Sequence, residues 1–172
     1  MKIDLRDDEK TILAYIKDRL AGFDIGSNDG PGDGQTVNQI NFGYSSDQAG
    51  FFALVFDTRP DADTDGEWNS YLDDETMLEL EHWSDATDAM EDQTVTVVDR
   101  LGKAHEFIDY ESDTPIEELI GEMLLKLMVD ARDSKLFHSL PLGDPCHIAI
   151  EDQLGAWGWP MYDDRGKPET SA

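Results

Sequence analysis

Residues 57–68, with the sequence DTRPDADTDGEW, have the residue types and the spacing that can bind a cation. Calcium takes about six to eight oxygen ligands, so its binding loops place carboxylates at alternating positions and a glycine at the sharp turn. Asp61, Asp63, Asp65 and Gly66 meet these two requirements. The three aspartates are therefore the candidate metal ligands, and calcium is the candidate bound ion.

The second half of an EF-hand calcium loop is missing from this segment. Counting from Asp61, Leu72 occupies the position where a bidentate glutamate is needed. The run FFALVF and Pro60 precede the loop, where an EF-hand has a helix. Aspartate and glycine are also favoured in ordinary turns, because aspartate bonds to nearby backbone and glycine tolerates positive φ. We favour an acidic connecting loop, with a looser calcium site that adds Asp57 or Asp73 as the alternative.

No other group of residues in the sequence indicates a catalytic site. Cys146 and His147 are neighbours, but a cysteine nucleophile also needs a base close to it in space, and no local signature surrounds this pair. The four histidines are dispersed along the chain, whereas a zinc site needs clustered ligands. Phosphate-binding and nucleophile-elbow motifs are absent from the sequence. We therefore expect a protein that is not an enzyme.

The formal net charge of −26 is the most extreme property of the sequence. It comes from 39 acidic and 13 basic residues among 172. Such a field repels nucleic acid and anionic membranes, so we expect neither as a partner. Three interpretations stay open: the charge steers a basic protein partner, it binds cations, or it serves solubility in a salty cytoplasm.

Aromatic residues beside the acids provide possible anchors for a protein partner. Trp68 follows the acidic loop, and Trp159 lies in GAWGWPMY, close to further aspartates. An aromatic anchor with charged surroundings suits a protein-binding surface. The alternative is that the rings of Trp157 and Trp159 close over the core. The candidate partner-binding residues are Asp61, Asp63, Asp65, Glu67, Trp68 and Trp159.

Apolar periodicity predicts a single α+β domain over residues 1–172, with a mostly antiparallel sheet packed by two helices. A cap-like Thr-Pro pair and a stripe of apolar residues at helical spacing predict the longer helix. Residues 73–92 indicate a short helix within them, with Met77, Leu80 and Trp83 on one side. The predicted elements are helices at 7–20 and 114–136, a hairpin of strands 38–45 and 51–56, a second hairpin within 94–107, and a short strand at 147–150.

The beginning of the sequence is charged, and the chain holds a single cysteine, Cys146. An apolar signal-peptide core is missing from the first twenty residues, and one cysteine forms no internal disulfide. We expect a cytoplasmic location from these two features.

The sequence resembles small bacterial proteins of unknown function, and among these are the immunity proteins of polymorphic-toxin systems, including SUKH-type domains. The resemblance lies in the amphipathic segment near the N-terminus, in FFALVFDT leading to DGEW, and in GWPMY. It implies a single α+β domain that binds and blocks a toxin, often a basic nuclease. The expected function is therefore a non-enzymatic acidic binding protein of the immunity type. The alternatives are a calcium-binding module that uses the loop at 61–65, or an acidic protein of unknown function.

Overall fold

The computed structural model describes residues 1–21, 36–45, 50–57, 77–90, 92–107, 115–152 and 160–163. Its elements are β1 Lys2–Asp4, α1 Leu5–Ala21, β2 Val37–Ser45, β3 Phe51–Asp57, β4 Leu78–Glu79, α2 His82–Ala89, β5 Val95–Val98, β6 Ala104–Phe107, α3 Pro115–Asp133, the 3₁₀ helix η2 Leu136–Ser139, β7 Leu142–Asp152 and β8 Pro160–Asp163.

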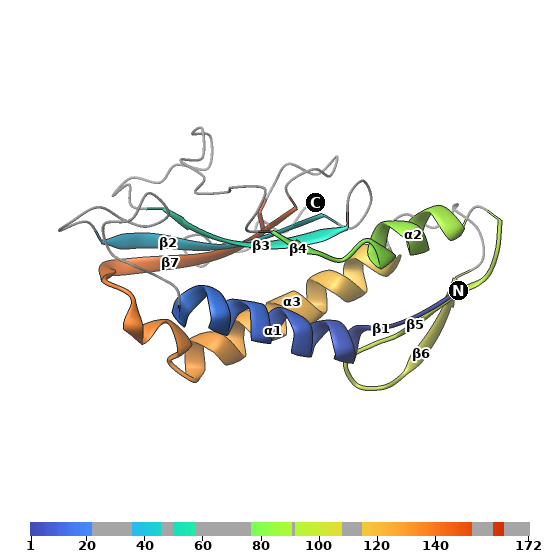
Figure 1. Cartoon of the computed structure of the whole chain (residues 1–172), viewed down its shortest axis with the longest axis horizontal. Helices are drawn as coiled ribbons and strands as arrows, with labels where there is room; N and C mark the ends of the chain where they lie inside the picture. The colour runs from blue at the N-terminus through green and yellow to red at the C-terminus, as the bar shows by residue number, and fades with distance from the viewer. Residues whose placement is uncertain are drawn as a thin grey trace, which may run out of the picture.

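Two sheets and two long helices make up the α+β architecture (Figure 1). The larger sheet has the strand order β4-β3-β2-β7-β8, and α1 and α3 cover one of its faces. The smaller sheet, with the order β1-β5-β6, lies beyond one end of these helices, where α2 contacts β1.

The main hydrophobic core lies between the helices and the larger sheet. Ile16 of α1 and Ile120 of α3 are fully buried, as are Phe42 and Phe52 of the sheet. The rings of Phe42 and Phe52 meet edge to face with their centroids 5.6 Å apart, the geometry that the ring quadrupoles favour. Full burial of each such side chain contributes about 1.5–3 kcal/mol, which is why this layer dominates stability.

The structure confirms the helices and hairpins that the sequence predicts. The first predicted helix corresponds to α1, and the second to α3, whose stripe of Ile116, Ile120, Met123, Leu127 and Ala131 is buried. Both predicted hairpins form as antiparallel pairs, β2 with β3 and β5 with β6. The strand predicted at 147–150 is the middle of the longer β7.

The expectation of a mostly antiparallel sheet is wrong, because both sheets are mixed. In the larger sheet β2 runs parallel to β7, and in the smaller sheet β1 runs parallel to β5. The parallel partners are far apart in sequence, so each pairing requires a long connection that contains helices.

Two details of the predicted burial are also wrong. Strand β2 is buried on both faces, including Gln39 and Asn41, and it is the central strand of the sheet. Met77 does not share one side with Leu80 and Trp83: it packs with a small cluster around Phe51, apart from the main core. The short helix begins only at His82.

Among the described helices, none is long and apolar enough to span a membrane.

Candidate interaction surface

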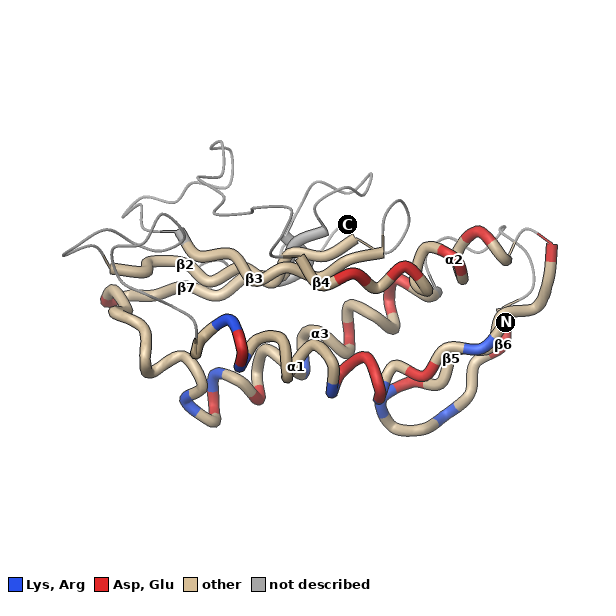
Figure 2. The backbone as a smooth tube through the Cα atoms, in the orientation of Figure 1, with Lys and Arg blue, Asp and Glu red and all other residues tan. Residues whose placement is uncertain are grey.

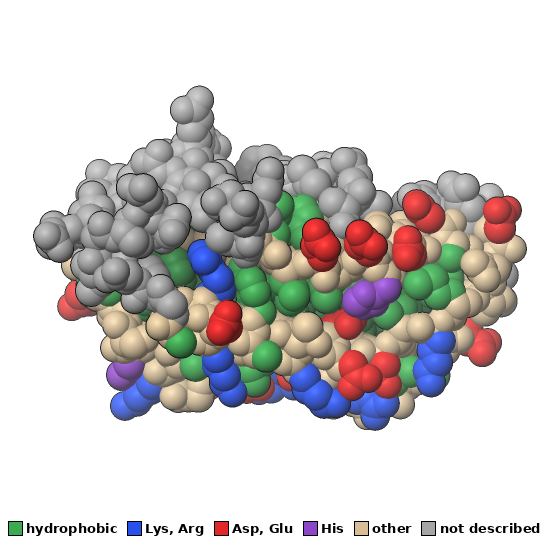
Figure 3. All heavy atoms as spheres, in the orientation of Figure 1, with side chains coloured by type: hydrophobic (Ala, Val, Ile, Leu, Met, Phe, Trp, Pro, Cys, Tyr) green, Lys and Arg blue, Asp and Glu red, His purple; other side chains and the backbone are tan. Residues whose placement is uncertain are grey.

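Residues 60–99 contain fourteen aspartates and glutamates and neither lysine nor arginine. The described part of this region, 77–90 and 92–99, includes β4 and α2. Five of its acids are exposed, and Asp92, which follows α2, is one of them. The other four, Glu79, Glu81, Asp85 and Asp88, lie from β4 to α2, and we call these four residues the acidic strip. Figure 2 shows acidic positions following one another along β4 and α2, and Figure 3 shows their side chains in a row on this edge of the molecule.

Helical spacing places Asp85 and Asp88 outside and the apolar residues of α2 inside. Trp83, Ala86 and Met90 are buried at intervals of three and four residues, whereas Asp85 and Asp88 are exposed. The Thr87 hydroxyl donates a hydrogen bond to the carbonyl of Trp83, 3.1 Å away, so this polar residue is satisfied inside the helix. The same periodicity that buries Trp83 and Ala86 therefore exposes the two acids of the strip that lie in α2.

Asp8 of α1 fixes the beginning of α2. Its carboxylate is buried, and it accepts a hydrogen bond from the indole N–H of Trp83 at 2.9 Å. The imidazole Nε2 of His82 lies 2.9 Å from the other carboxylate oxygen. Trp83 is 0% exposed and His82 is half-buried. A buried carboxylate with two ring partners is well satisfied, so these contacts hold α2 against α1.

A close backbone approach positions the segment before α2. Gly50 immediately precedes β3, and its carbonyl accepts a hydrogen bond of 2.6 Å from the N–H of Leu80. Gly50 has a φ of +53°, and a Cβ atom there would overlap the Leu80 carbonyl oxygen. Glycine is therefore required at this position, where the chain comes close to the end of β4.

The acids of the strip form no ion pair with any residue that the structure describes. Elsewhere, carboxylates have cationic neighbours: Asp7 pairs with Lys10 at 2.7 Å, and Glu9 with Arg100 at 3.2 Å. The strip is thus a negative surface that no described residue neutralises by an ion pair. Such a surface attracts cations and basic proteins over a distance set by the ionic strength.

One acid of the strip, Asp88, lies where the dipole of α2 disfavours a negative charge. Asp85 lies in the first turn of α2, but Asp88 lies near the negative C-terminal end, where α2 has no basic residue. We expect Asp88→Asn to raise the free energy of unfolding by about 0.3–1 kcal/mol and Asp85→Asn to lower it by a similar amount. Urea unfolding at low salt measures both. Equal changes of the same sign would contradict this account of the helix.

All six partner-binding candidates from the sequence, Asp61, Asp63, Asp65, Glu67, Trp68 and Trp159, lie outside the described residues, as does the candidate calcium site. Within the described residues, no three His, Cys, Asp or Glu side chains cluster as metal ligands would. Cys146 is half-buried on β7 and packs against the main core.

Sequence reasoning missed the acidic strip and the Asp8 contacts. The acids of α2 recur at helical spacing, and the absence of lysine and arginine from residues 60–99 is readable from the sequence. Asp8 gave no such signal, because an acid in the first turn of a helix is favoured whether or not it is buried. Comparisons with protein-family models, curated proteins and solved structures found no match.

Proposed function

We propose that the chain is a non-enzymatic binding protein of the immunity type, whose acidic surface occludes a basic protein. The observation that carries the proposal is the acidic strip: four exposed carboxylates without an ion-pair partner among the described residues. Asp88 lies near the negative end of the α2 dipole, which disfavours a carboxylate there. An acid that served only solubility could lie at any exposed position without this cost.

The mechanism is electrostatic steering followed by occlusion. A negative surface raises the local concentration of a cationic partner and speeds the encounter, and lysine or arginine at the partner's active site then pairs with the carboxylates. The acidic loop that contains Asp61, Asp63 and Asp65 belongs to the same stretch free of lysine and arginine, and it would extend this surface. Affinity would come from an aromatic anchor such as Trp68 or Trp159.

The test compares two double variants with the same change in charge. Glu81→Gln with Asp85→Asn removes two charges from the strip, and Asp18→Asn with Glu122→Gln removes two from exposed positions on α1 and α3. The partner is the basic protein that the wild-type chain captures from its native host. We expect the strip variant to slow association by about tenfold at low salt, because charges at an interface act mainly on encounter.

Surface-binding kinetics at low and physiological salt measure this effect. The α1/α3 variant should associate almost as fast as the wild type, and salt should slow the wild type more than the strip variant. Capture of no basic protein, or equal slowing in the two variants, would remove the basis of the proposal.

A further inference from the structure

Leu101 is the most exposed large apolar residue that the structure describes. It is 84% exposed, whereas Met1, Leu142 and Leu125 are 36–39% exposed. It lies in the turn between β5 and β6, whose sequence is DRLGK. The turn does not require leucine, since Asp99 and Gly102 provide the turn chemistry. Leu101 therefore presents apolar surface that neither the turn nor the core uses.

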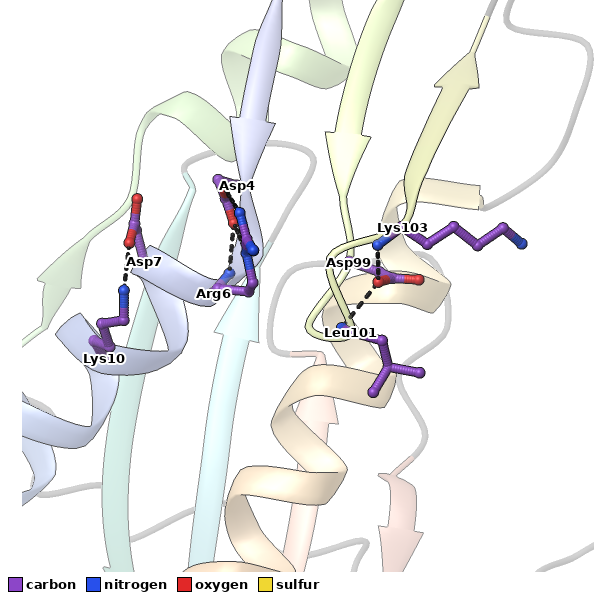
Figure 4. Close-up of polar contacts among 7 residues, drawn as sticks. All are labelled: Asp4, Arg6, Asp7, Lys10, Asp99, Leu101 and Lys103. Carbon is purple, nitrogen blue, oxygen red and sulfur yellow. Dashed lines mark hydrogen bonds and ion pairs between the residues drawn. The ribbon is translucent and has the colours of Figure 1, made fainter.

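The turn presents Leu101 on a fixed backbone. The N–H of Gly102 donates to the Asp99 carbonyl, and the N–H of Asp99 donates to the Lys103 carbonyl, both at 2.9 Å. The Asp99 carboxylate accepts from the N–H groups of Leu101 and Lys103, again at 2.9 Å, as Figure 4 shows. Its second oxygen lies 2.8 Å from Nε2 of His105, and this bond holds the pKa of Asp99 below its usual value.

One ion pair attaches the turn to the body of the protein, and the Arg6 guanidinium lies close beside Gly102. A Cβ atom on Gly102 would lie 3.3 Å from the Arg6 guanidinium, which in turn binds Asp4 through two hydrogen bonds of 2.8 and 2.5 Å. Arg100 pairs with Glu9 of α1 at 3.2 Å. These contacts already restrict the conformations of the turn. Docking it therefore costs less conformational entropy than docking a mobile loop.

The charge of the turn is opposite to that of the acidic strip. Lys103 is exposed and forms no ion pair with any described residue, and its side chain extends away from the turn in Figure 4. The acidic strip offers carboxylates beside the half-buried Leu78. An exposed leucine with an adjacent ammonium group is thus complementary to a surface that this chain itself carries.

We propose that the β5–β6 turn of one copy of the chain docks, through Leu101 and Lys103, on the acidic strip of a second copy. Leu101 would lie against the apolar side chains beside the strip, with Lys103 among its carboxylates. The contact joins two different surfaces, so it is heterologous. It would cover the surface proposed to bind a basic protein, and self-association would then compete with that partner.

The salt dependence of this contact is opposite to that of binding a basic protein. Two copies of net charge −26 repel each other at low salt, where the screening length is about 30 Å at 0.01 M. At about 0.15 M this length falls to about 8 Å, which screens the net repulsion more than a short contact. Self-association should therefore strengthen as salt rises over this range, whereas binding of a basic protein should weaken.

Sedimentation of the full chain, at protein concentrations up to about 1 mM and across this salt range, measures self-association. We expect Leu101→Ser to lower the association constant by at least about tenfold, because a central apolar anchor is lost. The matched control is Leu125→Ser on α3, which changes an exposed leucine outside the contact and should leave the constant unchanged. Circular dichroism verifies that both variants are folded.

A charge exchange between copies tests which surfaces meet. Lys103→Glu and the double variant Glu81→Lys with Asp85→Lys should each associate weakly alone, and a mixture of the two should regain the wild-type constant. A chain that stays monomeric in all conditions, or a Leu101→Ser variant that associates like the wild type, would overturn the proposal. A mixture whose association constant stays as low as that of each variant alone would also overturn it. None of these results depends on a basic partner, so the proposed function is tested separately.

Discussion

Replacing Trp83 by alanine should lower the free energy of unfolding by about 3–5 kcal/mol, the range for truncating a buried tryptophan. Trp83 is fully buried, and it is among the largest side chains in the core. Its loss leaves a cavity between α2 and the core and removes the indole donor from the buried Asp8 carboxylate. Urea unfolding followed by far-ultraviolet circular dichroism measures the change without using tryptophan fluorescence.

Trp83→Phe separates the hydrogen bond from the packing. Phenylalanine retains most of the apolar volume but cannot donate to Asp8, so we expect a smaller loss, of about 1–3 kcal/mol. A Phe variant as unstable as the Ala variant would show that the hydrogen bond outweighs the packing. An Ala variant within about 1 kcal/mol of the wild type would contradict the placement of Trp83 in the core.

The sequence predicts elements whose signal is local. The stripe of α3 and the alternation in β2 each reside within one segment, and short turns pair neighbouring strands. The pairing of β1 with β5 is different, because β1 has three residues and its partner lies more than ninety residues further along the chain. No local pattern encodes such a pairing, so it becomes visible only in the assembled fold.

The same distinction explains the candidate surface. The aspartates at 61, 63 and 65 are recognisable in the sequence because their spacing matches half of an EF-hand calcium loop. Glu81, Asp85 and Asp88 match no motif, and they become a surface only once α2 turns Trp83 inward. The contact of Asp8 with His82 and Trp83 joins residues more than seventy positions apart, which no single-sequence pattern predicts.

Gly50→Ala should lower the free energy of unfolding by about 2–5 kcal/mol. A φ of +53° costs about 1–2 kcal/mol for a residue with a Cβ atom, and forcing atoms into a packed site adds about 1–3 kcal/mol. The new methyl group would overlap the Leu80 carbonyl oxygen and lie 2.9 Å from the Cα of Glu81. These are backbone atoms, so relief requires moving the segment that leads into α2.

Gly102→Ala is the matched control, because Gly102 also has a positive φ, of +84°. Its added Cβ would meet only the Arg6 side chain, at 3.3 Å, and a long side chain yields more easily than backbone. This variant should therefore show little beyond the conformational cost of about 1–2 kcal/mol. Chemical unfolding of the two variants in parallel measures the loss in free energy of unfolding for each. The difference between the two losses is the steric contribution at Gly50. Equal losses would contradict the close approach of Gly50 to the end of β4, whereas a larger loss at Gly50 is the result that this contact predicts.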